Sequence, residues 1–494
     1  MKPKISRRDA LSAVAKVAIG AGVAVAAAGG VAAYFATRPP QVIEKVVTSV
    51  VERPVEKTVV TTVAGVPTTV LTTVKETETV VLSPTEERKK GITVILPKHE
   101  MDIIGWWETK TAEFEEKTGI PVTLVRMPWE YVADKVLAAM SAGSSEYDVI
   151  ELDNAWVAKF AEAGWASPLE DYPGAKDMME GHLPGLIQKF SYKGHLAGIT
   201  WNNDSRYFMY NKAMLEAAGI KAPPKSWDEF VDYCKALKGV SWVDSTGQKR
   251  ILEYPVVAAW QESQIGLNEY AFFTYTFGGE FFDENMKCVI NRGGAVEALE
   301  FMVDLINKGY VAPGYATNDY EMQLSAFLAG DAAFMYQAWG GVYGYSLDPR
   351  LSKIVNQVEF APLVPYKPGA APWSLTLPEA MAIPKFSKNK EYAWEYIKFM
   401  ASKEVNKEMC LKIGALPIWK DLYEDPDVLK KYPYFKLITE QNKYLRGHPD
   451  LVWYDEWATK LASEFSAAIT QKKSPKEALD TVYSWVKENH PDFA

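Results

Sequence analysis

The stretch WNNDSRYFMYNKAMLEAAGI, residues 201–220, concentrates side chains that can do chemistry. Polar residues fill positions 202–206, and the aromatic residues around them are Trp201, Tyr207, Phe208 and Tyr210. Amide and carboxylate groups make directional hydrogen bonds, and aromatic rings add large apolar contact areas. This mixture suits a catalytic cleft, a site that holds a polyhydroxylated ligand without changing it, or a loop that leads into a buried strand.

Hydrolysis of a glycosidic bond is the enzymatic chemistry that these residue types would serve. It needs a pair of carboxylates, for which Asp204 and Glu262 are the candidates. The sequence contains no nucleophile elbow, P-loop or HExxH motif, and its five histidines form no cluster. Cys234, Cys288 and Cys410 are too far apart for a CxxC site, although one disulfide among them could form. We therefore expect no catalytic residue, no metal and no cofactor, and keep a hydrolase as an alternative.

Composition and charge narrow the class of protein further. The chain has 494 residues, 48% of them hydrophobic and 24% charged, as in globular proteins with more than one hydrophobic core. The 16 Trp and 26 Tyr residues must fill cores or line contact surfaces. A formal net charge of -9 leaves no basic surface to neutralise phosphates, so we expect no nucleic-acid partner.

The N-terminal segment predicts an export signal and a tether. Basic residues precede an apolar run, and SRRDAL resembles a twin-arginine signal, so residues 1–40 are expected to be a signal or a membrane anchor. Residues 41–90 are rich in Thr and Val and predict an extended stalk. A stalk is useful only when its base is held, which favours an anchor retained in the membrane over a cleaved signal that would release the protein. Both a retained anchor and a cleaved signal would place the rest of the chain outside the cytoplasm.

After residue 90, strands and helices alternate. Strands are expected over 91–96, 120–127 and 147–153, and helices over 106–119, 129–143 and 154–164. This alternation predicts parallel βαβ units with helices on both faces of a sheet. Since ligands bind beyond the carboxyl ends of such strands, the loops at 97–102 and 151–156 should share one rim.

The second half of the chain is mostly helical by pattern. Two helix starts are marked by capping boxes, in which a serine side chain caps the helix and a glutamate three residues later reaches back. These pairs are Ser226 with Glu229 and Ser474 with Glu477.

Six further segments follow one another along the chain: FEEKTGIPVTL, YDVIELDNAWVAKFAEAGWASPLED, YKGHLAGITWNNDSRYFMYNKAMLEAAGIKAPPKSWDEF, AFLAGDAAFMYQAWG, AMAIPKFSKNKEYAWEYIKFM and GALPIWK. Together and in this order they resemble the extracellular solute-binding proteins of ABC transporters, in particular the sugar-binding group that includes maltose-binding proteins. The resemblance covers residues 91 to 494. It implies an α/β fold with two lobes, the type II periplasmic-binding-protein-like fold. Each lobe would be a mainly parallel sheet flanked by helices, with a multi-strand hinge between them.

The resemblance also implies where the lobes divide. Lobe 1 would comprise residues 91–203 plus 376–416, and lobe 2 residues 207–372 plus 420–494. The chain would cross between lobes near Asn202–Tyr207, Trp373–Pro378 and Leu416–Lys420, and the lobes would close over a ligand.

Ligand contacts are expected after strands one and three, at the crossovers and on the facing lobe. The candidates, beside Lys98, are His99, Glu100, Asp153, Asn154, Trp156, Trp201, Asn202, Asp204, Trp260, Glu262, Trp339, Gly340, Trp373 and Trp453. Structural roles stay open for several of them. Asn154 could cap a helix, Asp204 could pair with Arg206, and the tryptophans could pack in a core.

The expected protein is a monomeric substrate-binding component of an ABC importer. It would capture a saccharide, most simply an oligosaccharide, and deliver it to the permease subunits at the outer face of the membrane. Two alternatives remain: the anchored glycoside hydrolase, and a binder of another solute. A cleft with several acids and few aromatic residues would favour a cation, and clustered arginines would favour an anion.

Overall fold

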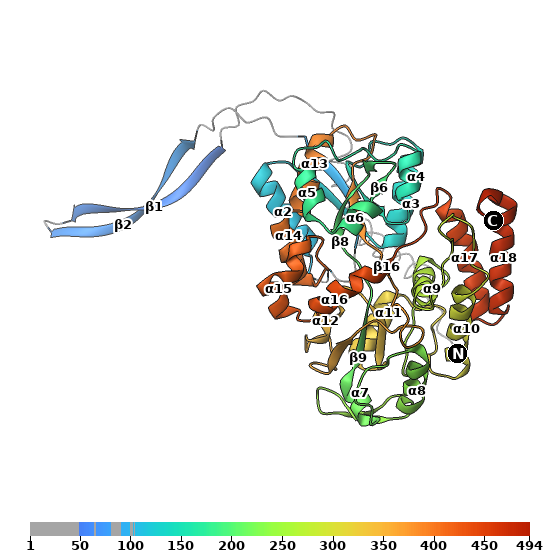
Figure 1. Cartoon of the computed structure of the whole chain (residues 1–494). Coiled ribbons are helices and arrows are strands. Elements are labelled where there is room, and N and C mark those ends of the chain that lie inside the picture. Colours follow the sequence, from blue (N-terminus) through green and yellow to red (C-terminus); the bar gives the residue numbers. More distant parts are fainter. Residues whose placement is uncertain (1–48, 64–65, 81–89, 99–101, 103) are drawn as a thin grey trace, which may run out of the picture. The chain divides into compact units, whose positions relative to one another are not determined.

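The computed structural model describes residues 49–63, 66–80, 90–98, 102 and 104–494, which Figure 1 shows as ribbons. The chain divides into two compact units, Met1–Arg88 and Lys89–Ala494. The predicted signal or anchor at residues 1–40 lies outside the described residues. Within the described residues, no helix has the length and apolar character needed to cross a membrane.

The first unit contains a β-hairpin. Strands β1 (Ser49–Val63) and β2 (Val66–Val80) pair antiparallel along their whole length, with Ser49 opposite Val80 and Val63 opposite Val66. The segment predicted to be an extended stalk is therefore a paired hairpin and not a single extended chain. Each strand satisfies the backbone hydrogen-bonding groups of its partner that face it, which a lone strand leaves to solvent. The function of the hairpin as a stalk stays a prediction.

The second unit contains a five-stranded mixed sheet in the order β4-β3-β5-β15-β8. Its strands are β3 (Ile92–Pro97), β4 (Val122–Met127), β5 (Val149–Asp153), β8 (Ile199–Asn202) and β15 (Glu379–Ala382). β3 pairs parallel with β4 and β5, as the alternating pattern predicts, whereas β15 runs antiparallel to β5 and β8. The helices predicted between these strands are α2 (Trp106–Thr118), α3 (Trp129–Ser141) and α4 (Val157–Glu162).

A second sheet has the order β12-β9-β13, formed by β9 (Tyr207–Asn211), β12 (Phe334–Ala338) and β13 (Val358–Ala361). Both neighbours of β9 run antiparallel to it, and parallel pairing is limited to isolated bridges from Val256 to Val311 and Phe334. The prediction of a mainly parallel sheet is therefore wrong here. A buried apolar strand has the same pattern in either direction, so its direction depends on the connections between strands.

Helices make up most of the rest of the second unit (Figure 1). They are α5 (Ala175–Gly181), α6 (Pro184–Lys189), α7 (Lys212–Ala217), α8 (Trp227–Leu237), α9 (Gln264–Thr276), α10 (Gly294–Asn307), α11 (Tyr320–Ala329), α12 (Val342–Ser346), α13 (Lys390–Met400), α14 (Lys403–Ile413), α15 (Pro426–Lys431), α16 (Phe435–Gln441), α17 (Tyr454–Ile469) and α18 (Pro475–Asn489). Short strand pairs are β6 (Ser191–Tyr192) with β7 (His195–Leu196), β10 (Ser241–Val243) with β11 (Lys249–Ile251), and β14 (Ser374–Leu375) with β16 (Leu445–Arg446).

The serine caps of the two predicted capping boxes are present, and the Glu229 side chain reaches back to the amide of Lys225 at 2.6 Å, one residue before the cap. The Ser226 hydroxyl accepts a hydrogen bond from the Glu229 amide at the start of α8, and the Ser474 hydroxyl does the same for the Glu477 amide of α18, both at 3.2 Å. The three cysteines are buried and free, so the disulfide left open by the sequence does not form.

The three segments predicted to cross between lobes lie together and are hydrogen-bonded to one another. The amide of Asn203 donates to the carbonyl of Leu416 at 3.2 Å. The amide of Arg206 donates to Leu375 at 3.0 Å, and the amide of Leu377 donates to the carbonyl of Asp204 at 2.9 Å. Segments far apart in sequence therefore form one small backbone assembly between β8 and β9.

Candidate functional site

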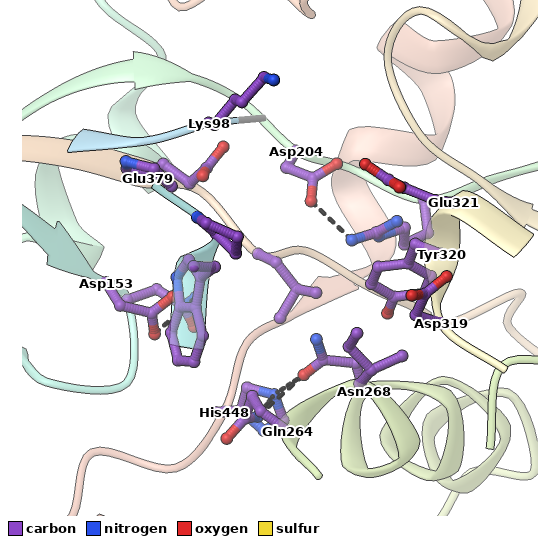
Figure 2. A pocket seen from close by; sticks show the side chains of 17 residues that line it. Lys98, Asp153, Asp204, Gln264, Asn268, Asp319, Tyr320, Glu321, Glu379 and His448 are labelled. Atoms are coloured by element: carbon purple, nitrogen blue, oxygen red, sulfur yellow. Dashed lines mark hydrogen bonds and ion pairs between the residues drawn. The ribbon is translucent and has the colours of Figure 1, made fainter. Parts of the chain in front are cut away.

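A cavity of about 270 Å³ lies beside this crossover assembly (Figure 2). Its wall comes from four parts of the chain: the strand ends of the first sheet, the crossover itself, α9 with a later loop, and the start of α11. Its polar and aromatic lining residues are Lys98, Trp129, Asp153, Asn154, Asp204, Arg206, Gln264, Asn268, Asp319, Tyr320, Glu321, Glu379 and His448.

The first sheet contributes residues from the carboxyl ends of its parallel strands, as predicted. Lys98 follows β3, and Asp153 and Asn154 lie at the end of β5, at the edge of the cavity. A carboxylate oxygen of Asp153 accepts a hydrogen bond from the Ala155 amide at 2.8 Å and contacts the Asn154 side-chain nitrogen at 3.4 Å. Burial raises the pKa of Asp153 to about 6, because an ionised carboxylate is costly to desolvate.

The crossover contributes an ion pair between Asp204 and Arg206. The guanidinium donates to the Asp204 carboxylate at 2.7 Å, and both side chains are almost fully buried. The guanidinium also lies over the rings of Tyr320 and Trp339, at 5.1 and 5.4 Å from their centroids. Asp204 therefore has the ion-pair role that the sequence left open, and it also lines the cavity.

Helix α9 contributes an amide pair that is fixed by its neighbours. Ser263 caps this helix, and Gln264 and Asn268 lie one turn apart on the same face. The Gln264 side-chain nitrogen donates to Asn268 at 2.9 Å and to the Tyr454 hydroxyl at 2.8 Å. His448 contacts the Asn268 side-chain oxygen at 2.6 Å, and burial lowers the pKa of His448 to about 3, so this imidazole is neutral.

The start of α11 closes the opposite side of the cavity. Asp319 caps the helix by accepting from the Met322 amide at 2.8 Å, and Tyr320 and Glu321 follow it. Figure 2 shows Asp153 and Glu379 on one side of the cavity and Asp319 and Tyr320 on the other, with Asp204 between them. A ligand in the cavity would therefore contact residues from both sides at once.

Four predicted tryptophans lie in the hydrophobic core, and none of them lines the cavity. Trp201 packs edge-to-face on Trp107, and Trp156 packs on Phe160. Trp260 donates from its indole nitrogen to Glu269 at 3.1 Å. Trp339 packs on Tyr320, so it supports a ring of the cavity wall from behind.

The remaining candidates also lie away from the cavity wall. Asn202 is buried and donates to Glu379 at 2.9 Å, so it contacts a lining residue. Gly340 allows a close approach of backbone to backbone, since a Cβ there would lie 2.7 Å from the Gly414 carbonyl oxygen. Trp373 lies against Arg446, and Trp453 is stacked on His490 with centroids 3.7 Å apart.

Two predictions fall on residues that the structure does not describe. His99 and Glu100 lie outside the described residues, next to the lining residue Lys98.

The structure does not bring the carboxylate pair proposed for a hydrolase together at the cavity, because Glu262 is exposed and is not among its lining residues.

The sequence did not predict the polar residues that α9 contributes to the cavity wall. The sequence pointed to Trp260 and Glu262 in this region, but Gln264 and Asn268 line the cavity. Recognising Ser263 as a helix cap would have pointed to the first helical turn and its i, i+4 neighbour. His448 lies in a loop, where no periodic pattern could have revealed it.

The structure has two sheets flanked by helices and joined by several crossovers, with a cavity beside those crossovers. These features define a two-lobed binding protein of the periplasmic type. A family model described as bacterial extracellular solute-binding protein matches residues 111–436, and the chain belongs to this family.

Individual relatives agree with this assignment. The chain is 25% identical over 374 residues to a probable ABC transporter-binding protein of Deinococcus radiodurans, covering 74% of this chain and 86% of that one. It is 26% identical over 281 residues to a maltotriose-binding protein of Pyrococcus abyssi, covering 55% of each chain. The structure of maltose-bound T. maritima MalE3 matches with a TM-score of 0.73 at 25% identity, covering 81% of this chain and 99% of that one.

Proposed function

We propose that this protein is the substrate-binding component of an ABC importer that captures a saccharide in the cavity beside the crossovers and delivers it to the permease. The single observation that carries the saccharide assignment is the wall of the cavity. Two rings, Trp129 and Tyr320, come from separate parts of the fold and are surrounded by amides and carboxylates. Sugars need flat apolar surfaces for their ring faces and fixed hydrogen-bonding groups for their hydroxyls.

Binding without catalysis fits the same wall. The family and its relatives are binding proteins, and the carboxylates of the wall have structural partners. Asp204 is paired with Arg206, Asp319 caps α11, and Glu379 accepts a hydrogen bond from Asn202. In this proposal the protein acts as a monomer, with residues 1–40 as a retained anchor and residues 41–90 as the tether to the outer face of the membrane.

Capture is coupled to closure in this proposal, because the ligand gains its full set of contacts only when both sides of the cavity reach it. A thermal-shift screen of monosaccharides and oligosaccharides on residues 90–494 would identify ligands. Solution scattering with and without the best ligand then measures compaction. We expect a raised melting temperature together with a smaller radius of gyration. Compaction with a non-sugar solute, and with no sugar, would exclude the saccharide assignment. Release of shortened products from an oligosaccharide would instead favour the hydrolase.

A further inference from the structure

The cavity wall carries more negative than positive charge. Five lining residues have carboxylates: Asp153, Asp204, Asp319, Glu321 and Glu379. Among the described residues of the wall, Lys98 and Arg206 alone bring positive charge, and Arg206 is already engaged with Asp204. A neutral sugar can be held by amides, hydroxyls and paired carboxylates alike, so a net negative charge of the wall is more than the saccharide assignment requires. It raises the local concentration of a cationic solute and disfavours an anionic one.

Several acceptor groups of the wall add to this negative charge. Ionised carboxylates only accept hydrogen bonds. The side-chain oxygen of Asn154, in a residue only 1% exposed, is an acceptor without a hydrogen-bond partner. When Nε2 of neutral His448 carries the proton and donates to Asn268, its Nδ1 becomes a second buried acceptor without a partner. Both atoms are closed off from solvent, so they add negative potential behind the wall and do not contact a ligand directly. A protonated amine, with three donors and no acceptor, suits such a wall.

The volume of the cavity and the distribution of the acidic residues around its wall restrict the ligand further. A volume of about 270 Å³ lies just below the range of roughly 300–1,000 Å³ typical for drug-sized ligands, so one or two sugar rings fit better than a longer chain. Among the residues that the structure describes, no group of three or more His, Cys, Asp or Glu side chains could hold a metal ion. The acids are spread around the wall instead, which suits an organic cation.

We propose that the solute is an amino sugar of one or two rings, whose protonated amine is held by the carboxylates of the cavity wall. This inference rests on the proposed function. It narrows the ligand to a short, positively charged saccharide, whereas the sequence pointed to an oligosaccharide.

The test compares matched sugars at neutral pH by isothermal titration calorimetry. D-glucosamine, D-galactosamine, D-mannosamine and the glucosamine disaccharide are each paired with the hydroxyl analogue and with the N-acetyl analogue, which keeps the nitrogen but removes its charge. At least one amine should bind about tenfold more tightly than both neutral partners, since charge-assisted hydrogen bonds are roughly twice as strong as neutral ones. Its affinity should fall as salt is added.

A variant separates the carboxylate effect from sugar binding in general. Glu321→Gln removes one exposed carboxylate of the wall and should weaken the amine several-fold more than it weakens the hydroxyl analogue. Glu488→Gln, on α18 and outside the wall, is the matched control and should change neither.

The two proposals fail in different ways. A neutral analogue that binds as tightly as its amine, or better, overturns the amino-sugar inference and leaves the saccharide function standing. Failure of every amine in the panel overturns the inference as well. If putrescine binds and no sugar of either kind does, both proposals are wrong.

Discussion

The carboxylate of Asp204 and the guanidinium of Arg206 form a buried ion pair at 2.7 Å in the segment that joins β8 to β9. Removal of one member leaves the other charged in a buried environment, which typically costs about 3–5 kcal/mol. We therefore expect Asp204→Ala to lower the free energy of unfolding by that amount in denaturant titrations. Asp304→Asn breaks an exposed pair with Lys308 on α10 and should cost less than about 1 kcal/mol. Equal effects of the two variants would show that the buried pair contributes no special stability.

Trp129 is the aromatic residue that we expect to contact the ligand from the first-sheet side. It is partly buried and lines the cavity at the start of α3. Trp129→Ala should weaken binding of the best saccharide by tenfold or more in calorimetry, because ring stacking and buried apolar area are lost together. Tyr131→Ala, two residues further on at a site that is 63% exposed, is the control and should bind normally. Unchanged affinity in Trp129→Ala would remove this ring from the site.

Lys189 at the end of α6 joins the predicted lobe 1 to a loop of predicted lobe 2. Its amine donates to the Asp450 carboxylate at 2.6 Å and to the His448 carbonyl at 3.1 Å. We expect Lys189→Met to speed ligand dissociation several-fold in stopped-flow measurements, because contacts made in the closed form mainly affect the off-rate. Lys193→Met breaks a pair with Glu162 within the predicted lobe 1 and serves as the control. Identical dissociation rates in both variants would argue against a role of Lys189 in closure.

Glu269 should make stability depend on pH. Burial raises its pKa from 4.5 to about 7, although hydrogen bonds from Tyr336, Trp260 and Gln323 and the nearby charge of Arg206 act in the opposite direction. The folded protein therefore binds more protons than the unfolded chain. Its stability should fall by roughly 3 kcal/mol as the pH rises from about 4.5 to about 7, and level off above that.

Unfolding titrations of Glu269→Gln across this range should show a decline that is smaller by that amount, and the part that remains includes Asp153, whose pKa burial also raises. Glu464→Gln is a control of opposite sign. Burial alone would raise the pKa of Glu464, but hydrogen bonds from Lys460 and Lys473 lower it overall. The stabilisation that Glu464 contributes is present at neutral pH, and it is lost as the pH falls through the lowered pKa of the folded state. Parallel pH profiles of the wild type and Glu269→Gln would contradict the raised pKa of Glu269.

Gly340 should be sensitive to a single added methyl group. A Cβ at this position would lie 2.7 Å from the Gly414 carbonyl oxygen, and the opposing atoms are backbone that cannot easily move. Gly340→Ala should therefore lower the free energy of unfolding by about 1–3 kcal/mol. Gly185→Ala is the matched control, since nothing lies within 4 Å of its Cβ in α6 and alanine should stabilise the helix by about 0.5–1 kcal/mol. An unchanged stability of Gly340→Ala would show that the two backbone segments can separate without cost.

Elements that depend on local pattern could be predicted from the sequence. The strands β3, β4 and β5, the helices between them and the caps at Ser226 and Ser474 all follow from residue periodicity and capping chemistry. The direction of β9 relative to β12 could not be predicted, because it depends on connections to distant segments. The hairpin of β1 and β2 was missed for the same reason, since strand propensity does not say which strand a segment pairs with.

The candidate site likewise contains residues that local pattern predicts and residues that only long-range packing places. The loops after β3 and β5 reach the cavity because parallel strands end at one edge of a sheet, and this was predictable for Asp153 and Asn154. Whether a tryptophan faces a core or a ligand depends on what packs against it, so Trp201, Trp260 and Trp339 could not be sorted by type alone. Sequence by itself determined the family, the α/β class and one rim of the cavity. Only the tertiary structure decided that Gln264, Asn268, Tyr320 and His448 complete its wall, because long-range packing brings together α9, the start of α11 and a distant loop.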